Sequence, residues 1–161
     1  MPEFLQKGDW LTKIDLLLAY CHVPIAQAHR PFLRLVYDKE ILQMTCLPFG
    51  LSSAPQNFAA ISNWIADILR SPGIRLVVYL DDFCLASQNR DRLITQTLEA
   101  INLLEFLGWK INHDKCILKP CQNSEFLGIQ WNTLTNQMSL PKAVYTAVTF
   151  RGSYLVSINR D

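Results

Sequence analysis

Residues 74–86 read IRLVVYLDDFCLA, and this stretch decides the fold. The apolar, β-branched run at 74–79 is typical of a buried strand, and the run at 83–86 is typical of a second one. Leu80, Asp81 and Asp82 stand between the two runs, so the segment predicts a strand, an acidic turn and a strand. Carboxylates at such a junction lose hydration, which is costly unless another group compensates their charge.

Helices are predicted on both sides of this strand pair. Ser53-Ala54-Pro55-Gln56 is typical of a helix start, because serine caps, proline suits the first turn and glutamine completes a capping box. The first helix is expected over 53–70 and the second over about 90–107, with Gly108 at its C-terminal end. The apolar positions expected to face inward are Phe58, Ile61, Trp64, Ile65, Ile68 and Leu69, then Leu93, Leu98, Ile101, Leu104 and Leu107.

Further strands are predicted towards the two ends of the chain. Residues 11–17, LTKIDLL, indicate a buried strand that contains Asp15. Residues 32–46 indicate a hairpin with a polar connection at 38–40, and residues 125–140 a second hairpin that begins with the strand EFLGIQW. This order predicts an α+β fold in which helices cover one face of an antiparallel sheet.

Composition limits the classes of protein to which the chain can belong. Its 161 residues are 50% hydrophobic and 18% charged, which indicates one globular domain rather than a disordered chain. The net charge of +1 argues against an autonomous nucleic-acid binder, whose affinity comes from neutralising phosphates. Five cysteines without paired spacing favour reduced thiols in an intracellular protein, cytoplasmic or nuclear. No apolar stretch approaches the roughly 20 residues of a membrane span, so no membrane association is expected.

The three aspartates can be interpreted in two ways. Asp15 alone is explained by a salt bridge or a cap, and Asp81-Asp82 alone by an ordinary hairpin turn. Together, carboxylates at the ends of adjacent strands concentrate negative charge at one edge of a sheet, and Mg²⁺, which prefers oxygen ligands, would compensate it. Because alternate strand residues face opposite sides, only a tight turn brings both Asp81 and Asp82 to the site. Asp81 is therefore the stronger ligand candidate and Asp82 the supporting one.

Five segments in order resemble the successive sequence blocks of a reverse-transcriptase palm. They are IDLLLAY at 14–20, LPFGLSSAP at 47–55, VVYLDDF at 77–83, LEFLGWKINHDKC at 104–116 and SEFLGIQW at 124–131. The segments LPFGL at 47–51 and YLDD at 79–82 are most similar to those of gypsy-like and DIRS-like retrotransposons. The resemblance covers about residues 10–141 and implies a ferredoxin-like palm fold.

The resemblance implies a role for each matched residue. Asp15, Asp81 and Asp82 match the metal-binding triad for two Mg²⁺ or Mn²⁺ ions, and Lys115 matches a residue that protonates the departing pyrophosphate. A solvated surface lysine is an equally good interpretation of Lys115. Tyr20 matches the aromatic gate against ribose, for which the alternative is a core tyrosine. The remaining matches are Phe49 and Gly50 beneath the incoming base and template, Tyr79 and Leu80 near the primer terminus, and Leu127 and Gly128 in the primer-gripping hairpin.

The resemblance also implies a domain organisation and a function. Residues 1–10 are expected to be a remnant of the fingers or a connector, 11–141 the palm, and 142–161 a divergent tail, with fingers and thumb missing. The implied function is RNA-directed DNA polymerisation by two-metal nucleotidyl transfer. Its partners are an RNA or DNA template-primer, deoxynucleoside triphosphates and the fingers, thumb and RNase H segments of a parent polyprotein. The alternative is a catalytically inactive, retroelement-derived remnant with at most a binding role.

Overall fold

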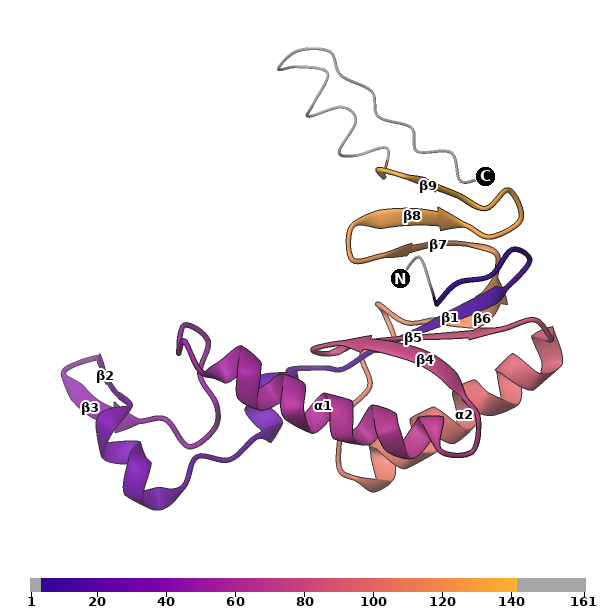
Figure 1. The fold of residues 1–161 in the computed structure, drawn as a ribbon. Helices are drawn as coiled ribbons and strands as arrows, with labels where there is room; N and C mark the ends of the chain where they lie inside the picture. The colour runs from indigo at the N-terminus through magenta and orange to yellow at the C-terminus, as the bar shows by residue number, and fades with distance from the viewer. Residues whose placement is uncertain (1–3, 142–161) are drawn as a thin grey trace, which may run out of the picture.

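The computed structural model describes residues 4–141, and the expected divergent tail at 142–161 lies outside the described residues. Its main sheet has the strand order β4-β5-β1-β6, and every neighbouring pair is antiparallel (Figure 1). These strands are β1 Trp10–Asp15, β4 Arg75–Tyr79, β5 Asp82–Ser87 and β6 Ile117–Cys121, with helices α1 Ala54–Arg70 and α2 Arg90–Phe106 between them. The order β-α-β-β-α-β with this arrangement is the ferredoxin-like fold, so the predicted α+β class is confirmed.

Both helices cover the same face of the main sheet, as expected (Figure 1). Phe58 and Ile65 from α1 and Leu93 and Leu104 from α2 share one buried cluster with sheet residues such as Phe83. Each of these side chains is at most 1% exposed, and burying one stabilises the fold by about 1.5–3 kcal/mol. The helices do not cover the other face of the main sheet, which packs against other parts of the chain.

The predicted inward faces of the helices are confirmed at Phe58, Ile65, Leu69, Leu93, Ile101 and Leu104, which are buried, but not at four other positions. Trp64 and Leu98 are 58% and 56% exposed, and Ile68 and Leu107 also face outward. Small or polar residues take their places, because helix and sheet approach closely there; these residues are Ser62 and Ala66 in α1, and Gln96, Thr97 and Ala100 in α2.

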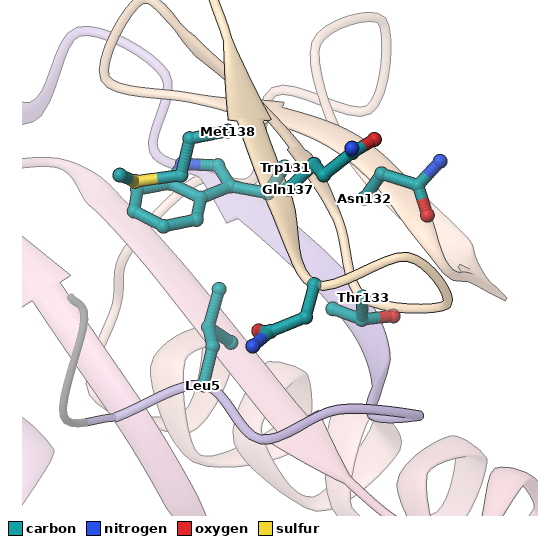
Figure 2. A pocket seen from close by; sticks show the side chains of 7 residues that line it. Leu5, Trp131, Asn132, Thr133, Gln137 and Met138 are labelled. Carbon is teal, nitrogen blue, oxygen red and sulfur yellow. The ribbon is translucent and has the colours of Figure 1, made fainter. Parts of the chain in front are cut away.

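The second face of the main sheet packs against a small three-stranded sheet. Its strands are β7 Asn123–Phe126, β8 Ile129–Asn132 and β9 Gln137–Ser139. Phe126 and Trp131 join Leu11, Cys84 and Ala86 in a second buried cluster. Figure 2 shows Leu5 of the N-terminal segment opposite Trp131 and Met138, around a hollow of only about 10 Å³. The N-terminal segment is therefore closely packed against the small sheet.

Two local predictions are wrong in detail, and one strand was not predicted. EFLGIQW is not one strand, because Leu127 and Gly128 both take positive φ angles, 54° and 70°, and form a two-residue turn between β7 and β8. The Ser53 side chain makes no capping hydrogen bond, because its backbone is already helical. Strand β6 was not predicted at all, and it pairs with β1 through Leu11 and Lys13.

The predicted hairpin at 32–46 is present as β2 Arg34–Tyr37 and β3 Glu40–Gln43, joined by a turn at Asp38 and Lys39. It is reached through two short 3₁₀ segments, Ala19–His22 and Gln27–Phe32, and it stands away from the main sheet (Figure 1). All of its strand residues are exposed, including Val36 and Tyr37 at 73% and 71%. No helix in the described part of the chain is long and apolar enough to cross a membrane.

Candidate active site

The end of β1 and the start of β5 bring two of the aspartates face to face. Asp15 and Asp82 are direct partners in the antiparallel ladder, so their side chains lie on the same face of the sheet. Side chains alternate along a strand, and this face is therefore the one that carries Leu11 and Cys84, opposite the helices. The helices lie on the opposite face and do not cover these two carboxylates.

Asp81 reaches the same place through the tight turn between β4 and β5. Tyr79 and Asp82 close the hairpin, leaving Leu80 and Asp81 as its two-residue turn. The Asp81 carbonyl accepts a hydrogen bond of 3.2 Å from the Leu16 backbone N–H, which ties the turn to the end of β1. Leu80 has a φ of 53°, a left-handed conformation that costs a leucine about 1–2 kcal/mol. Backbone strain of this kind is concentrated at functional sites.

Asp15 is buried close to two other carboxylates, those of Asp81 and Asp82. Asp15 is only 6% exposed. Burial raises the pKa of Asp15 above its ordinary value of 3.8, and the negative charges of Asp82 and Asp81 raise it further. A hydrogen bond of 2.8 Å from the Asn112 amide and the charge of Lys115 act in the opposite direction. The carboxylate is thus held in a place where negative charge is only partly compensated.

Asp82 carries a polar atom that the described protein leaves without a hydrogen bond. The Lys13 ammonium lies 2.9 Å from Asp82 Oδ1, close enough for an ion pair. The contact does not have hydrogen-bond geometry, and within residues 4–141 this buried oxygen has no hydrogen-bond donor. The ammonium therefore compensates the charge of this oxygen without completing the hydrogen bond that a buried acceptor needs.

The donor set fits a hard divalent cation, although its ligands are not assembled in advance. Carboxylate oxygens suit Mg²⁺ and Mn²⁺. Among residues 4–141, no group of three or more histidine, cysteine, aspartate or glutamate side chains is arranged to hold a metal ion. The ion pair of Asp82 with Lys13 accounts for part of this, because it engages one of the three carboxylates.

Tyr20 lies next to this acidic group and also belongs to the core. It is 8% exposed, and its ring stacks on Phe58 at 4.9 Å and tilts against Phe49 at 5.0 Å. Burial raises the pKa of Tyr20, with smaller contributions from the charges of Asp81 and Tyr79. The two interpretations of Tyr20 are therefore compatible, because one ring both packs in the core and borders the site.

The remaining predicted site residues differ in how near they lie to the aspartates. Lys115 is exposed but close enough for its charge to act on Asp15. Phe49 and Tyr79 are exposed, and Phe49 is connected to the site through its contact with Tyr20. Gly50 has a φ of 90° and no atom within 4 Å of an added Cβ, so its backbone angle explains the glycine. Leu127 and Gly128 belong to a separate sheet, at the β7–β8 turn.

Sequence reasoning missed Lys13, Asn112 and Cys116. Lys13 could have been found, because it precedes Asp15 by two residues and so shares its face of the strand. Asn112 and Cys116 stand in the quoted block at 104–116, but their contacts with Asp15 span 97 and 101 residues. No local pattern indicates such contacts.

Comparison with known sequences identifies similar proteins. The family model described as reverse transcriptase (RNA-dependent DNA polymerase) matches residues 3–131. The chain is 28% identical over 125 residues to the Gag-Pol polyprotein of Rous sarcoma virus subgroup B, covering 72% of this chain and 8% of that protein. It is 27% identical over 131 residues to Protein P of a duck hepatitis B virus, covering 81% of this chain and 17% of that protein. The chain thus spans less than a fifth of the length of these relatives.

Solved structures show the same fold. A foamy viral protease–reverse transcriptase in complex with an RNA/DNA hybrid matches with a TM-score of 0.80 at 18% identity, covering 94% of this chain and 20% of that chain. The foamy viral enzyme in complex with dsDNA matches with a TM-score of 0.81, also at 18% identity, covering 94% of this chain and 30% of that chain. At this identity the match concerns the fold.

Proposed function

Since the chain belongs to the reverse transcriptase (RNA-dependent DNA polymerase) family, we propose that residues 11–141 form the palm of an RNA-directed DNA polymerase. The observation that carries the proposal is the pairing of the buried Asp15 with Asp82 on the face opposite the helices, with the charge of Asp81 also acting on Asp15. The reaction is the addition of deoxynucleotides to a primer 3′ end. The polymerase is proposed to be intracellular and to belong to a gypsy-like or DIRS-like retrotransposon, which the LPFGL and YLDD segments support.

Asp15 and Asp81 would hold the divalent cations, with Asp82 in support. When bound, two Mg²⁺ or Mn²⁺ ions activate an attacking hydroxyl and stabilise a leaving phosphate oxygen. The charges of Asp82 and Asp81 that act on the buried Asp15 carboxylate support this assignment, because a cation would compensate their negative charge. Lys13 keeps part of that charge compensated.

Other residues of the chain would position the substrates and move a proton. Tyr20, held between Phe49 and Phe58, would exclude a ribose 2′-hydroxyl and so select deoxynucleotides. Lys115, whose charge already acts on Asp15, would donate a proton to the departing pyrophosphate. The proposed template and primer contacts are Phe49 and Gly50 under the incoming base, Tyr79 and Leu80 at the primer terminus, and Leu127 and Gly128 in the primer-gripping hairpin.

Fingers, thumb and RNase H segments of a longer polyprotein are proposed to complete the enzyme. Relatives up to twelve times longer than the matched segment support this. Positioning of reactants contributes about 7–11 kcal/mol in favourable cases, and the triphosphate is expected to be positioned by the fingers. The 161-residue chain alone should therefore bind metal but extend a primer slowly or not at all.

The test is primer extension with the purified chain, in Mg²⁺ and in Mn²⁺, with Asp81→Asn as the matched control. Metal-dependent extension that disappears in the control would establish polymerase activity in this chain by itself. Metal binding without extension is the expected result and assigns the chain as a palm that needs its partner segments. A chain that neither binds metal nor extends a primer would favour the alternative, a catalytically inactive remnant with at most a binding role.

A further inference from the structure

The turn at residues 112–116 makes hydrogen bonds to the side chain, the carbonyl and the backbone N–H of Asp15. The Asn112 side-chain amide donates a hydrogen bond of 2.8 Å to Asp15 Oδ1. The Asn112 backbone N–H donates another, also of 2.8 Å, to the Asp15 carbonyl oxygen. The Asp15 backbone N–H donates to Cys116 Sγ at 3.2 Å. The side chain, the carbonyl and the amide of one aspartate are thus all held by residues of a single turn.

The side chain of Asn112 is not needed to form this turn. Backbone hydrogen bonds from Lys115 and Cys116 to the Asn112 carbonyl close it, at 3.0 and 3.2 Å. The chain before the turn is already aligned with the end of β1, through the bridge between Leu16 and Ile111. The amide therefore contributes something besides loop closure, and its acceptor is the carboxylate.

Asn112 restricts that carboxylate to one orientation. Oδ1 accepts the amide hydrogen bond, and Oδ2 accepts no hydrogen bond from the described residues. An asparagine amide is neutral, so it fixes the carboxylate without neutralising it, whereas a lysine or arginine would compete with a cation. Groups that orient a metal ligand through its second atom typically change metal affinity about 10- to 100-fold when they are removed.

We propose that Asn112 is a positioning residue that holds the Asp15 carboxylate for a divalent cation, with Cys116 fixing the Asp15 backbone. This inference rests on the proposed function, since it presupposes a cation at Asp15. It also explains why Lys115 lies near the site, because the same turn that holds Asp15 carries this lysine.

The experiment measures Mn²⁺ binding to the purified 161-residue chain by water-proton relaxation, together with thermal unfolding without metal. We expect Asn112→Ala to weaken Mn²⁺ binding about 10- to 100-fold. Asn112→Gln keeps an amide donor and should recover most of the affinity. Asn132→Ala is the matched control, because Asn132 is also half-buried and accepts hydrogen bonds in a turn, but between β8 and β9. Its affinity should equal that of the wild type.

Asp15→Asn separates the failure of this inference from that of the proposed function. If the wild type binds Mn²⁺, Asp15→Asn does not, and Asn112→Ala binds like the wild type, the positioning role is overturned while the metal site stands. If Asn112→Ala and Asn112→Gln lose affinity equally, the amide donor is not the cause and the inference is also overturned. If the wild type binds no Mn²⁺, or Asp15→Asn binds as well as the wild type, the metal site is overturned and the positioning role with it.

Discussion

Strand β1 has a buried aspartate at each end, and the two carboxylates differ in the groups that compensate their charge. Asp9, just before the strand, is 0% exposed and Asp15, its last residue, is 6% exposed. The Asp9 carboxylate accepts hydrogen bonds from the Arg75 guanidinium, the Gln88 amide and the Gln6 backbone N–H. The Asp15 carboxylate accepts one from Asn112 and lies near two more carboxylates.

The surroundings of a buried structural charge thus differ from those of a candidate metal ligand. At the Asp9 end a guanidinium compensates the charge, so the protein is complete without any further ion. At the Asp15 end Lys13 pairs with Asp82 and the charge of Lys115 acts on Asp15, but three carboxylates outnumber these two cations. The same residue type on the same strand is thus a structural anchor at one end and a candidate ligand at the other.

The largest expected effect comes from the same substitution made at each end. Asp9→Asn should lower the free energy of unfolding by about 3 kcal/mol, because it leaves the partly buried Arg75 guanidinium without its anion. Asp15→Asn should change stability by less than about 1 kcal/mol, because it removes repulsion along with charge. Urea unfolding without metal measures both values. Equal losses for the two variants would mean that Asp15 is also a structural anchor, and the comparison would fail.

A smaller effect is expected from adding metal to the same variants. Mn²⁺ at 10 to 100 times its dissociation constant should stabilise the wild type by about 1.4–2.7 kcal/mol, because it binds only the folded chain. Asp9→Asn should gain the same amount, since its metal site is intact, and Asp15→Asn should gain none. Thermal unfolding with and without Mn²⁺ tests this. Equal stabilisation of all three proteins would show that the ion binds elsewhere.

The smallest effect is a dependence of stability on pH in the absence of metal. The pKa of Asp15 is raised by burial above 3.8, so between that value and the raised pKa the folded chain binds more protons than the unfolded one. Stability therefore falls as pH rises through this window, relative to Asp15→Asn. The contribution is fully present below the unfolded pKa and lost above the folded pKa. Unfolding of the two proteins at a series of pH values checks the sign. A wild-type free energy of unfolding that rises with pH relative to that of Asp15→Asn would contradict it.

Much of the fold follows from local patterns in the chain. The strand–turn–strand at 74–86, the helices close to 53–70 and 90–107 and the exposed hairpin near 32–46 are confirmed. The exposure of four apolar residues expected to face inward and the split of EFLGIQW into β7 and β8 were not predicted. Periodicity shows that a helix has an apolar face, but the distance to the sheet decides which small residues lie at the contact. The positive φ at Leu127 was likewise not predicted, because residues other than glycine rarely take such an angle.

In the candidate site, too, some features follow from the local sequence and others only from tertiary contacts. Asp15, Asp81 and Asp82 were recognisable from the sequence alone, because a carboxylate in an apolar strand or between two such strands is conspicuous wherever the chain later folds. Their environment was not recognisable. Arg75 lies 66 residues from Asp9, and Asn112 lies 97 residues from Asp15. Sequence by itself determined which residues carry negative charge into the sheet, since hydrophobic patterning is local. Only the tertiary structure decided which charge is fully compensated and which only in part, since compensation depends on contacts between distant segments.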